Sequence, residues 1–166
     1  IHINSVKEVK PEIHARFDAL SRTYVYKISK TKNAFKYQDE HTYTLPLDID
    51  LMNQAAQMLF EYTDFQCFSK VKTDVKTYDC TIMEAHWTVK ENSLNFTIKA
   101  DRFLRNMVRA IVGTMIEVGA KKRTLKEFQA IIGSKNRSNA GTSAPAHGLY
   151  LMHIEYPKSI YVHEKA

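Results

Sequence analysis

Two segments in which apolar and polar residues alternate, joined by a polar turn, constrain the fold of this chain most strongly. Lys90-Glu-Asn-Ser93 separates them and has the composition of a turn. Apolar side chains fall on one face of each segment: Met83, Ala85, Trp87 and Val89 before the turn, and Leu94, Phe96, Ile98 and Ala100 after it. Alternation with a period of two is typical of strands with one buried face. The sequence therefore predicts a β-hairpin over residues 80–100.

The rest of the chain contains further periodic segments. Residues 22–28 and 149–154 are predicted strands, and an additional strand is expected near residues 2–9. Helical spacing begins at Asp50, a candidate N-cap, and a second helix is expected over residues 101–119. In that helix Asp101 would be the cap and Gly119 the C′ residue; Thr124 and Glu127 form a capping box for a third helix, ending at Gly133.

The resulting order is β-α-β-β-α-α-β, which belongs to the α+β class. It predicts a ferredoxin-like (split βαβ) plan, with one mostly antiparallel sheet and helices on one face. No repeat, low-complexity tract or Pro- or Gly-rich linker interrupts the chain, so residues 1–166 are expected to form a single domain.

Composition limits the possible functions. No apolar run is long enough for a transmembrane helix, and no signal peptide is recognisable. Two cysteines, Cys67 and Cys80, form neither a disulfide framework nor a CxxC metal signature, which fits a reduced cytosolic protein. The net charge of +6 suits a polyanion such as RNA or an anionic surface, although many basic proteins bind no nucleic acid. Because the chain begins at Ile1 and not at Met, we expect it to be a piece of a longer protein.

A row of arginines is the main candidate for chemistry. On a helical wheel Arg102, Arg105 and Arg109 share one side of the 101–119 helix, and Gly113 follows one turn later. Such a row could bind phosphates or a carboxylate, or it could be an ordinary solvated face. Arg109 has apolar neighbours and is expected to need an acidic partner. Gly113 would allow another backbone or a ligand to come close.

Several other residues allow both a functional and a structural interpretation. Tyr24 and Tyr26 share a face with Arg22 and could stack bases, or they could belong to the core. Lys121 and Lys122, between two helices, could touch phosphates or serve solubility alone. The long loop at 134–148 carries Arg137, and a connection of this length is often functional. No HExxH, Gly-rich phosphate loop, G-x-S-x-G or metal-ligand spacing is present in the sequence.

Four separate segments resemble one family, the tRNA pseudouridine synthases of the TruA type. Residues 14–28 are similar to the segment that opens the C-terminal half of that family, and residues 64–69 to its D-F-x-x-F motif. Residues 100–113, continued by 117–120, resemble F-[LV]-x-x-M-V-R-x-I-V-G, and residues 144–151 resemble A-x-x-x-G-L-Y-L. The ordered match spans about residues 10 to 157.

The resemblance implies an enzyme that isomerises uridine to pseudouridine in the anticodon stem-loop of tRNA, at positions 38–40. It implies no cofactor and no metal, a cytoplasmic homodimer, and a cleft between two ferredoxin-like halves. In this family an Asp of a G-R-T-D-A-G motif in the N-terminal half attacks the nucleotide. This sequence has no G-R-T-D; the nearest segment is Lys72-Thr-Asp74. We therefore expect the C-terminal half alone, inactive without the nucleophile.

Three site residues follow from the motifs. By resemblance, Tyr24 packs against the target base, Arg109 pairs with the catalytic Asp, and Leu149 lines the base pocket. The candidate contacts to the RNA backbone are Arg22, Arg102, Arg105, Lys121, Lys122 and Arg137. Two other functions remain open: a basic RNA-binding module without chemistry, and a dimerisation scaffold.

Overall fold

The computed structural model describes residues 2–71 and 75–162. It contains one open sheet in which β1 is the central strand. β1 is antiparallel to β4 on one side and to β5 on the other, parallel to the short β2 at its far end, and β3 pairs with β4. The strands are β1 (Ser21–Ser29), β2 (His41–Thr42), β3 (Ile82–Lys90), β4 (Ser93–Ala100) and β5 (Leu149–Glu155). The order β5-β1-β4-β3 is the ferredoxin-like arrangement that the sequence predicts, and the β3–β4 hairpin is confirmed.

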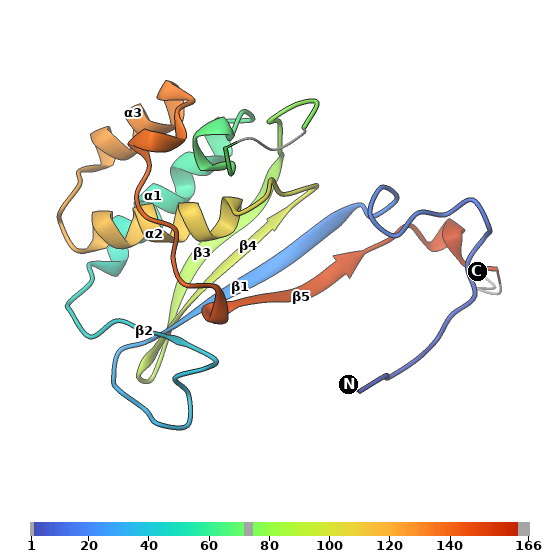
Figure 1. Cartoon of the computed structure of the whole chain (residues 1–166), viewed down its shortest axis with the longest axis horizontal. Helices are drawn as coiled ribbons and strands as arrows, with labels where there is room; N and C mark the ends of the chain where they lie inside the picture. The colour runs from blue at the N-terminus through green and yellow to red at the C-terminus, as the bar shows by residue number, and fades with distance from the viewer. Residues whose placement is uncertain (1, 72–74, 163–166) are drawn as a thin grey trace.

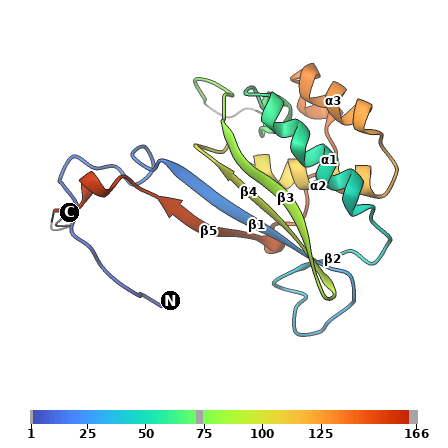
Figure 2. The same ribbon diagram turned by 180° about the vertical axis from the view of Figure 1, so that it is seen from behind.

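The helices lie on one face of this sheet, as predicted (Figure 1). α1 (Ile49–Met58) and α2 (Met107–Gly119) contact the sheet, and α3 (Leu125–Ser134) packs on α1 and α2. Figure 2 shows the other face of the sheet without helices, and β1 and β5 continuing as a two-stranded ribbon beyond the helical layer. The core lies between the helices and the sheet, where Phe96, Ile111 and Phe128 are fully buried.

The beginning of α2 differs from the prediction. Asp101 does not cap a helix: its Oδ1 accepts hydrogen bonds from the backbone N–H groups of Thr81 and Arg102, both at 2.7 Å. The helix begins only at Met107, after Asn106, which has a left-handed backbone (φ 69°). Arg102 and Arg105 therefore lie in a loop, and the predicted row of three arginines along one helix is wrong.

Other helix boundaries moved by a few residues. The N-cap of α1 is Asp48, which accepts from Leu51 N at 3.1 Å, and Asp50 lies in the first turn. Gly119 is the last residue of α2 and not its C′ residue. Gly133 lies inside α3, which ends at Ser134 before the left-handed Lys135. The capping box at the start of α3 is confirmed.

Two strand predictions also need correction. A register shift between Ile82 and Glu84 places Met83 in an exposed position, because the bulge inserts one residue against β4. In residues 2–9 the described structure has no strand, only an isolated bridge between Val9 and Tyr161.

Cys67 and Cys80 are both buried and unpaired. Among the described residues, no helix combines the length and hydropathy needed to cross a membrane.

Candidate functional site

The site is built where the loop before β5 lies against the first half of α2. Gly113 faces this loop, and a Cβ atom there would come within 1.8 Å of the carbonyl oxygen of Thr142. Ala144 N donates to the carbonyl of Arg109 at 2.9 Å, and Gly141 N donates to the Thr114 hydroxyl at 3.0 Å. The close approach expected at Gly113 is thus confirmed, and the partner is backbone.

Arg109 lines an open pocket of about 660 Å³. Its Nε donates to the carbonyl oxygen of Ala144 at 2.6 Å, which fixes the plane of the half-buried guanidinium. The described lining of the pocket contains four cations and no acid: Lys70, Val71, Arg105, Asn106, Arg109, Arg137 and Leu149. Within the described parts of the chain, Arg109 has no ion pair. A pocket with this charge favours an anionic group.

Arg137 shapes the loop that carries the pocket. One of its terminal nitrogens donates to the carbonyl of Gly141 at 3.1 Å, and the other donates to the Ser143 hydroxyl at 2.9 Å. Asn106 Nδ2 donates to the same hydroxyl at 2.6 Å. The sequence singled out Arg137, but Asn106 and Ser143 were missed, because nothing in the local pattern shows that they meet.

Leu149 forms one wall of the pocket and pairs with Tyr26 across β5 and β1. Tyr26 is completely buried, and its hydroxyl donates to the carbonyl of Pro145 at 2.8 Å. Burial raises the pKa of Tyr26 far above its ordinary value, although the charge of Arg109 acts in the opposite direction. Tyr26 is therefore a neutral core residue, and its interpretation as an exposed base-stacking residue is wrong.

Tyr24 lies two residues before Tyr26 on the same face of β1, in a neighbouring pocket of about 860 Å³. Its half-buried ring makes an edge-to-face contact with Phe103, with ring centroids 5.2 Å apart. Arg102 lines this second pocket as well. The structure thus brings Arg105, Arg109, Arg137 and Leu149 together in one pocket, and places Tyr24 and Arg102 in another.

Arg22 has a different environment from the one expected. Its guanidinium donates to the backbone carbonyls of Ala19 at 3.1 Å and Asp101 at 2.5 Å, and also to that of Arg16. These bonds join the segment before β1 to the segment after β4. Arg22 is therefore engaged with backbone at the edge of the Tyr24 pocket.

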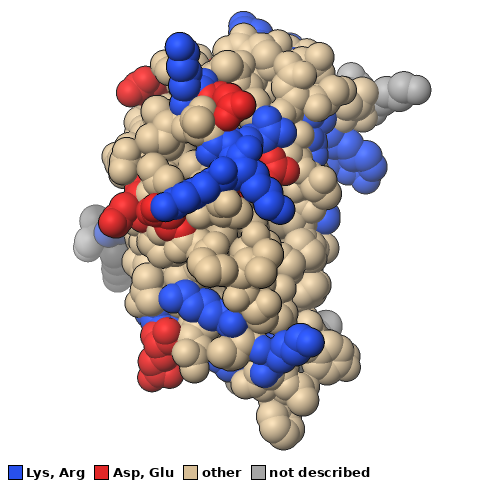
Figure 3. Space-filling view, turned by 90° about the vertical axis from the view of Figure 1, so that its left-hand side faces the viewer, with Lys and Arg blue, Asp and Glu red and all other residues tan. Residues whose placement is uncertain are grey.

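Lys121 and Lys122 are remote from both pockets. They follow the C-terminal end of α2, whose 13 residues span about 20 Å. Lys121 Nζ lies 3.3 Å from a carboxylate oxygen of Asp48, and Arg123 pairs with Glu117. Figure 3 views the molecule from the side that holds the α2–α3 loop in Figure 1, and there Lys and Arg side chains gather beside acidic ones.

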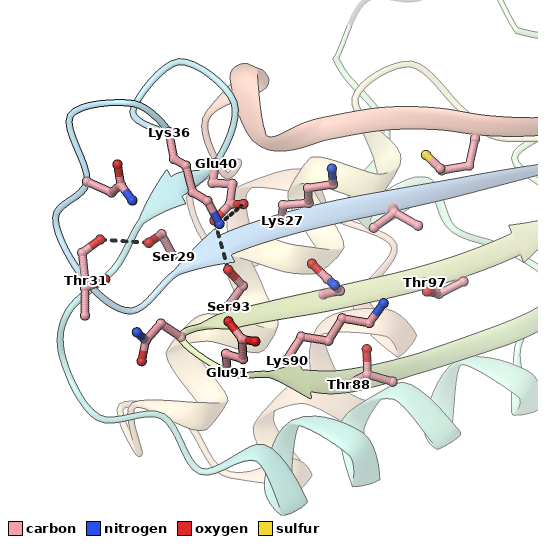
Figure 4. Close-up of a pocket in the computed structure, with 15 residues that line it drawn as sticks. Lys27, Ser29, Thr31, Lys36, Glu40, Thr88, Lys90, Glu91, Ser93 and Thr97 are labelled. Carbon is pink, nitrogen blue, oxygen red and sulfur yellow. Dashed lines mark hydrogen bonds and ion pairs between the residues drawn. The ribbon is translucent and has the colours of Figure 1, made fainter.

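A third hollow lies on the face of the sheet opposite the helices (Figure 4). It has a volume of about 920 Å³, and Lys27, Lys36 and Lys90 extend over it from β1, the following loop and β3. Glu40 offsets this charge, since it pairs with Lys36 at 3.3 Å and accepts from Ser93 at 3.0 Å. None of the predicted site residues lines this hollow.

Metal ligation finds no support in the described residues, where no group of three His, Cys, Asp or Glu side chains is placed to hold an ion. Two acidic side chains near the Tyr24 pocket already accept hydrogen bonds from backbone N–H groups. Asp18 accepts from the backbone N–H of His14 at 2.6 Å, and Asp101 accepts the two bonds described above.

Comparison with known proteins gives independent evidence on the family of this chain. A family model described as tRNA pseudouridine synthase matches residues 55–157. The protein named tRNA pseudouridine synthase A from Bacteroides fragilis is 52% identical over 162 residues, which is 97% of this chain and 64% of the relative. The protein of the same name from Bacteroides thetaiotaomicron is 50% identical over 99% of this chain and 62% of its own length.

A more distant relative shows the same relation. The protein of that name from Anoxybacillus flavithermus is 37% identical over 93% of this chain and 63% of its own length. The chain thus spans somewhat less than two thirds of the curated relatives that it matches. Since the family model covers more than half of the 166 residues, the chain belongs to the tRNA pseudouridine synthase family.

Proposed function

We propose that this chain supplies one half of the active site of an enzyme that isomerises uridine to pseudouridine in the anticodon stem-loop of tRNA, at positions 38–40, without a cofactor. In this isomerisation the bond between N1 of uracil and C1′ of ribose breaks, and a bond between C5 and C1′ forms. The hydrogen on C5 leaves as a proton and N1 gains one, so substrate and product have the same composition.

The observation that carries this proposal is the position of Arg109. Its guanidinium is oriented by a single bond to the carbonyl of Ala144, in a pocket whose described lining has four cations and no acid. A nucleophilic carboxylate in a water-poor pocket needs a cation to remain ionised and oriented. We assign Arg109 to that task.

Two residues are assigned to the base. Leu149 offers an apolar wall in the same pocket, and Tyr24 offers an aromatic face in the next one. A detached uracil needs flat, apolar surroundings so that it can turn without leaving the site. The target nucleotide must also leave its stack to reach these side chains.

The basic side chains are assigned to contacts with the tRNA, some near the target uridine and some farther from it. Arg105 and Arg102 line the pockets and would contact the backbone of the stem-loop. Lys121 and Lys122 would contact the tRNA farther away, beyond the end of α2. Arg22 and Arg137 would act indirectly, by holding the polypeptide backbone in place, since their guanidinium groups already bind backbone carbonyl oxygens of this chain.

We further propose that residues 1–166 form a single domain, and that the nucleophilic Asp is contributed from outside it. The sequence has no G-R-T-D-A-G motif, so the chain by itself would not catalyse the isomerisation. The complete enzyme would be a cytoplasmic homodimer that binds tRNA.

The test uses a chimera in which this chain replaces the matching 64% of the Bacteroides fragilis relative. Tritium released from tRNA labelled with [5-³H]uridine reports the isomerisation directly. We expect release by the chimera and none by the chain alone. In the chimera, Arg109→Ala should lower the single-turnover rate by about a hundredfold or more with nearly unchanged tRNA affinity. Lys126→Ala, at an exposed position of α3, is the control.

Other results would contradict the proposal in distinct ways. Release by the chain alone would show that an acid of this chain, such as Asp18 or Asp101, is the nucleophile. An Arg109→Ala chimera with weakened tRNA binding and an unchanged chemical rate would indicate an RNA-binding module. Absent or salt-independent tRNA affinity would indicate a dimerisation scaffold.

A further inference from the structure

An exposed aromatic side chain stands on the turn before β1, beside the Tyr24 pocket. Phe17 is 73% exposed and lines that pocket together with Arg16 and Tyr24. We infer that Phe17 is a stacking platform for an unpaired base of the RNA, next to the nucleotide that reaches Tyr24. This inference rests on the proposed function and adds a positioning contact to it.

The turn that carries Phe17 is held by hydrogen bonds at several points. Phe17 N and Asp18 N both donate to the carbonyl of His14, at 3.1 and 3.0 Å, and His14 N donates to the Asp18 carboxylate at 2.6 Å. The hydroxyl of Tyr156 donates to the carbonyl of Ala15 at 2.6 Å. The ring of Phe17 is therefore presented by an ordered backbone. Little conformational entropy would be lost when a ligand stacks on it.

The immediate neighbours of the ring suit a nucleotide. The His14 ring lies 4.4 Å from the Phe17 ring, measured between centroids and at an interplanar angle of 39°, and the Arg16 guanidinium lies 5.7 Å from its centroid. Aromatic rings stack on bases of any sequence, and an adjacent arginine adds a cation for the phosphate and a cation–π contact. A purely apolar protein partner would have no negative charge to pair with this arginine.

The rest of the pocket has the same character. Lys76 and Arg102 add two further cations, and Tyr24 and Phe103 add aromatic surface. The carboxylate in the lining, Asp101, is engaged by the N–H groups of Thr81 and Arg102. Interleaved cations and aromatics are the composition of single-stranded RNA sites. The volume of about 860 Å³ lies within the range of small-molecule pockets, roughly 300–1,000 Å³.

The chain provides a matched control. Phe35 is 95% exposed, more than Phe17, but it lies in the loop between β1 and β2 and is not among the residues of the Tyr24 pocket. Replacing either residue by Ala removes an exposed phenyl ring without disturbing the core. A difference between the two variants therefore reports the position of the ring and not its exposure.

The experiment measures the affinity of the full 166-residue chain for two fluorescently labelled RNAs by anisotropy. One is a 17-nucleotide anticodon stem-loop with an unpaired loop, and the other is a duplex of the same length. Phe17→Ala should weaken stem-loop binding by about tenfold and leave duplex binding unchanged, because stacking needs an unpaired base. Phe17→Trp should restore the affinity. Phe35→Ala should have no effect on either RNA.

The salt dependence separates the ring from the charge. Phe17→Ala should leave the slope of log affinity against log salt unchanged, whereas Arg16→Ala should reduce it by about one. Unchanged stem-loop affinity in Phe17→Ala, equal losses for both RNAs, or no stem-loop binding by the unsubstituted chain would each overturn the inference. If Phe17→Ala lost only stability in the chimera, the ring would be a contact to polypeptide. Tritium release by the chimera remains the separate criterion for the proposed function.

Discussion

Gly113 and Thr142 are in such close contact that a Cβ atom at position 113 would lie 1.8 Å from the carbonyl oxygen of Thr142. One turn earlier in α2, the carbonyl of Arg109 accepts from Ala144 N, and Arg109 Nε donates to the carbonyl of Ala144. The missing side chain therefore allows the loop to lie flat on the helix, and this contact sets the orientation of the arginine.

Gly113→Ala should destabilise the chain by about 1–3 kcal/mol, because the added methyl group must push the loop away from the helix. Urea denaturation followed by circular dichroism measures this change. The matched control is Gly133→Ala, since a Cβ atom at Gly133 in α3 meets nothing within 4 Å. That variant should gain up to about 1 kcal/mol from helix propensity. Equal stability of the two variants would contradict the packing described for Gly113.

Arg22→Met should lower the free energy of unfolding by about 1.5–3 kcal/mol, because it removes the charged donor from three backbone carbonyls. Arg102→Met should have a smaller effect, since the only bond of its guanidinium to a described residue is one of 3.4 Å to Thr77. Urea denaturation of the two variants decides this. If both were as stable as the unsubstituted chain, Arg22 would be a surface cation and a candidate RNA contact again.

Arg105→Ala and Lys122→Ala should affect different parts of the substrate. Arg105 lines the Arg109 pocket, so its loss should weaken binding of the chimera to both intact tRNA and the isolated anticodon stem-loop. Lys122 follows the far end of α2, so its loss should weaken binding to intact tRNA only. Each variant should reduce the salt slope for tRNA by about one. Filter binding with both RNAs tests this, and a stem-loop defect in Lys122→Ala would refute the assignment.

The ion pair between Asp64 and Lys135 predicts a pH dependence of stability. The carboxylate and the ammonium are 2.8 Å apart and join the turn at Gln66–Phe68 to the end of α3. Burial acts to raise the pKa of Asp64, but the hydrogen bonds from Lys135 and from Gln66 N outweigh it and hold the pKa below its ordinary value. A lowered folded-state pKa stabilises the fold above the ordinary pKa of about 4, and this contribution disappears as the pH falls through the lower value.

Asp64→Asn should therefore flatten the loss of stability between about pH 5 and pH 2. Lys135→Met should flatten it less, because Gln66 N still donates to the carboxylate. Urea denaturation across this range measures both effects. Acid limbs of equal slope in the unsubstituted chain and in Asp64→Asn would show that the pair contributes nothing.

Much of the fold could be predicted from the sequence because it depends on local periodicity. Alternation identified the β3–β4 hairpin, and the Thr124–Glu127 capping box correctly located the start of α3. The ferredoxin-like plan followed from the order of these elements. Two predictions failed where one residue changed the local geometry: the left-handed Asn106 delays α2, and the bulge after Ile82 exposes Met83.

The candidate site divides in the same way. Arg109, Tyr24 and Leu149 were proposed as site residues from motifs, and the close approach at Gly113 was predicted from its place on the helix face. By contrast, only the tertiary structure shows that Arg137 and Asn106 meet at Ser143, that Arg22 binds backbone carbonyls, and that Tyr24 occupies a separate pocket. The physical reason is the range of the interactions. Period and capping act within a few residues, so the sequence alone determined most of the elements, whereas the partners of the arginines lie up to 79 positions away and are chosen by packing.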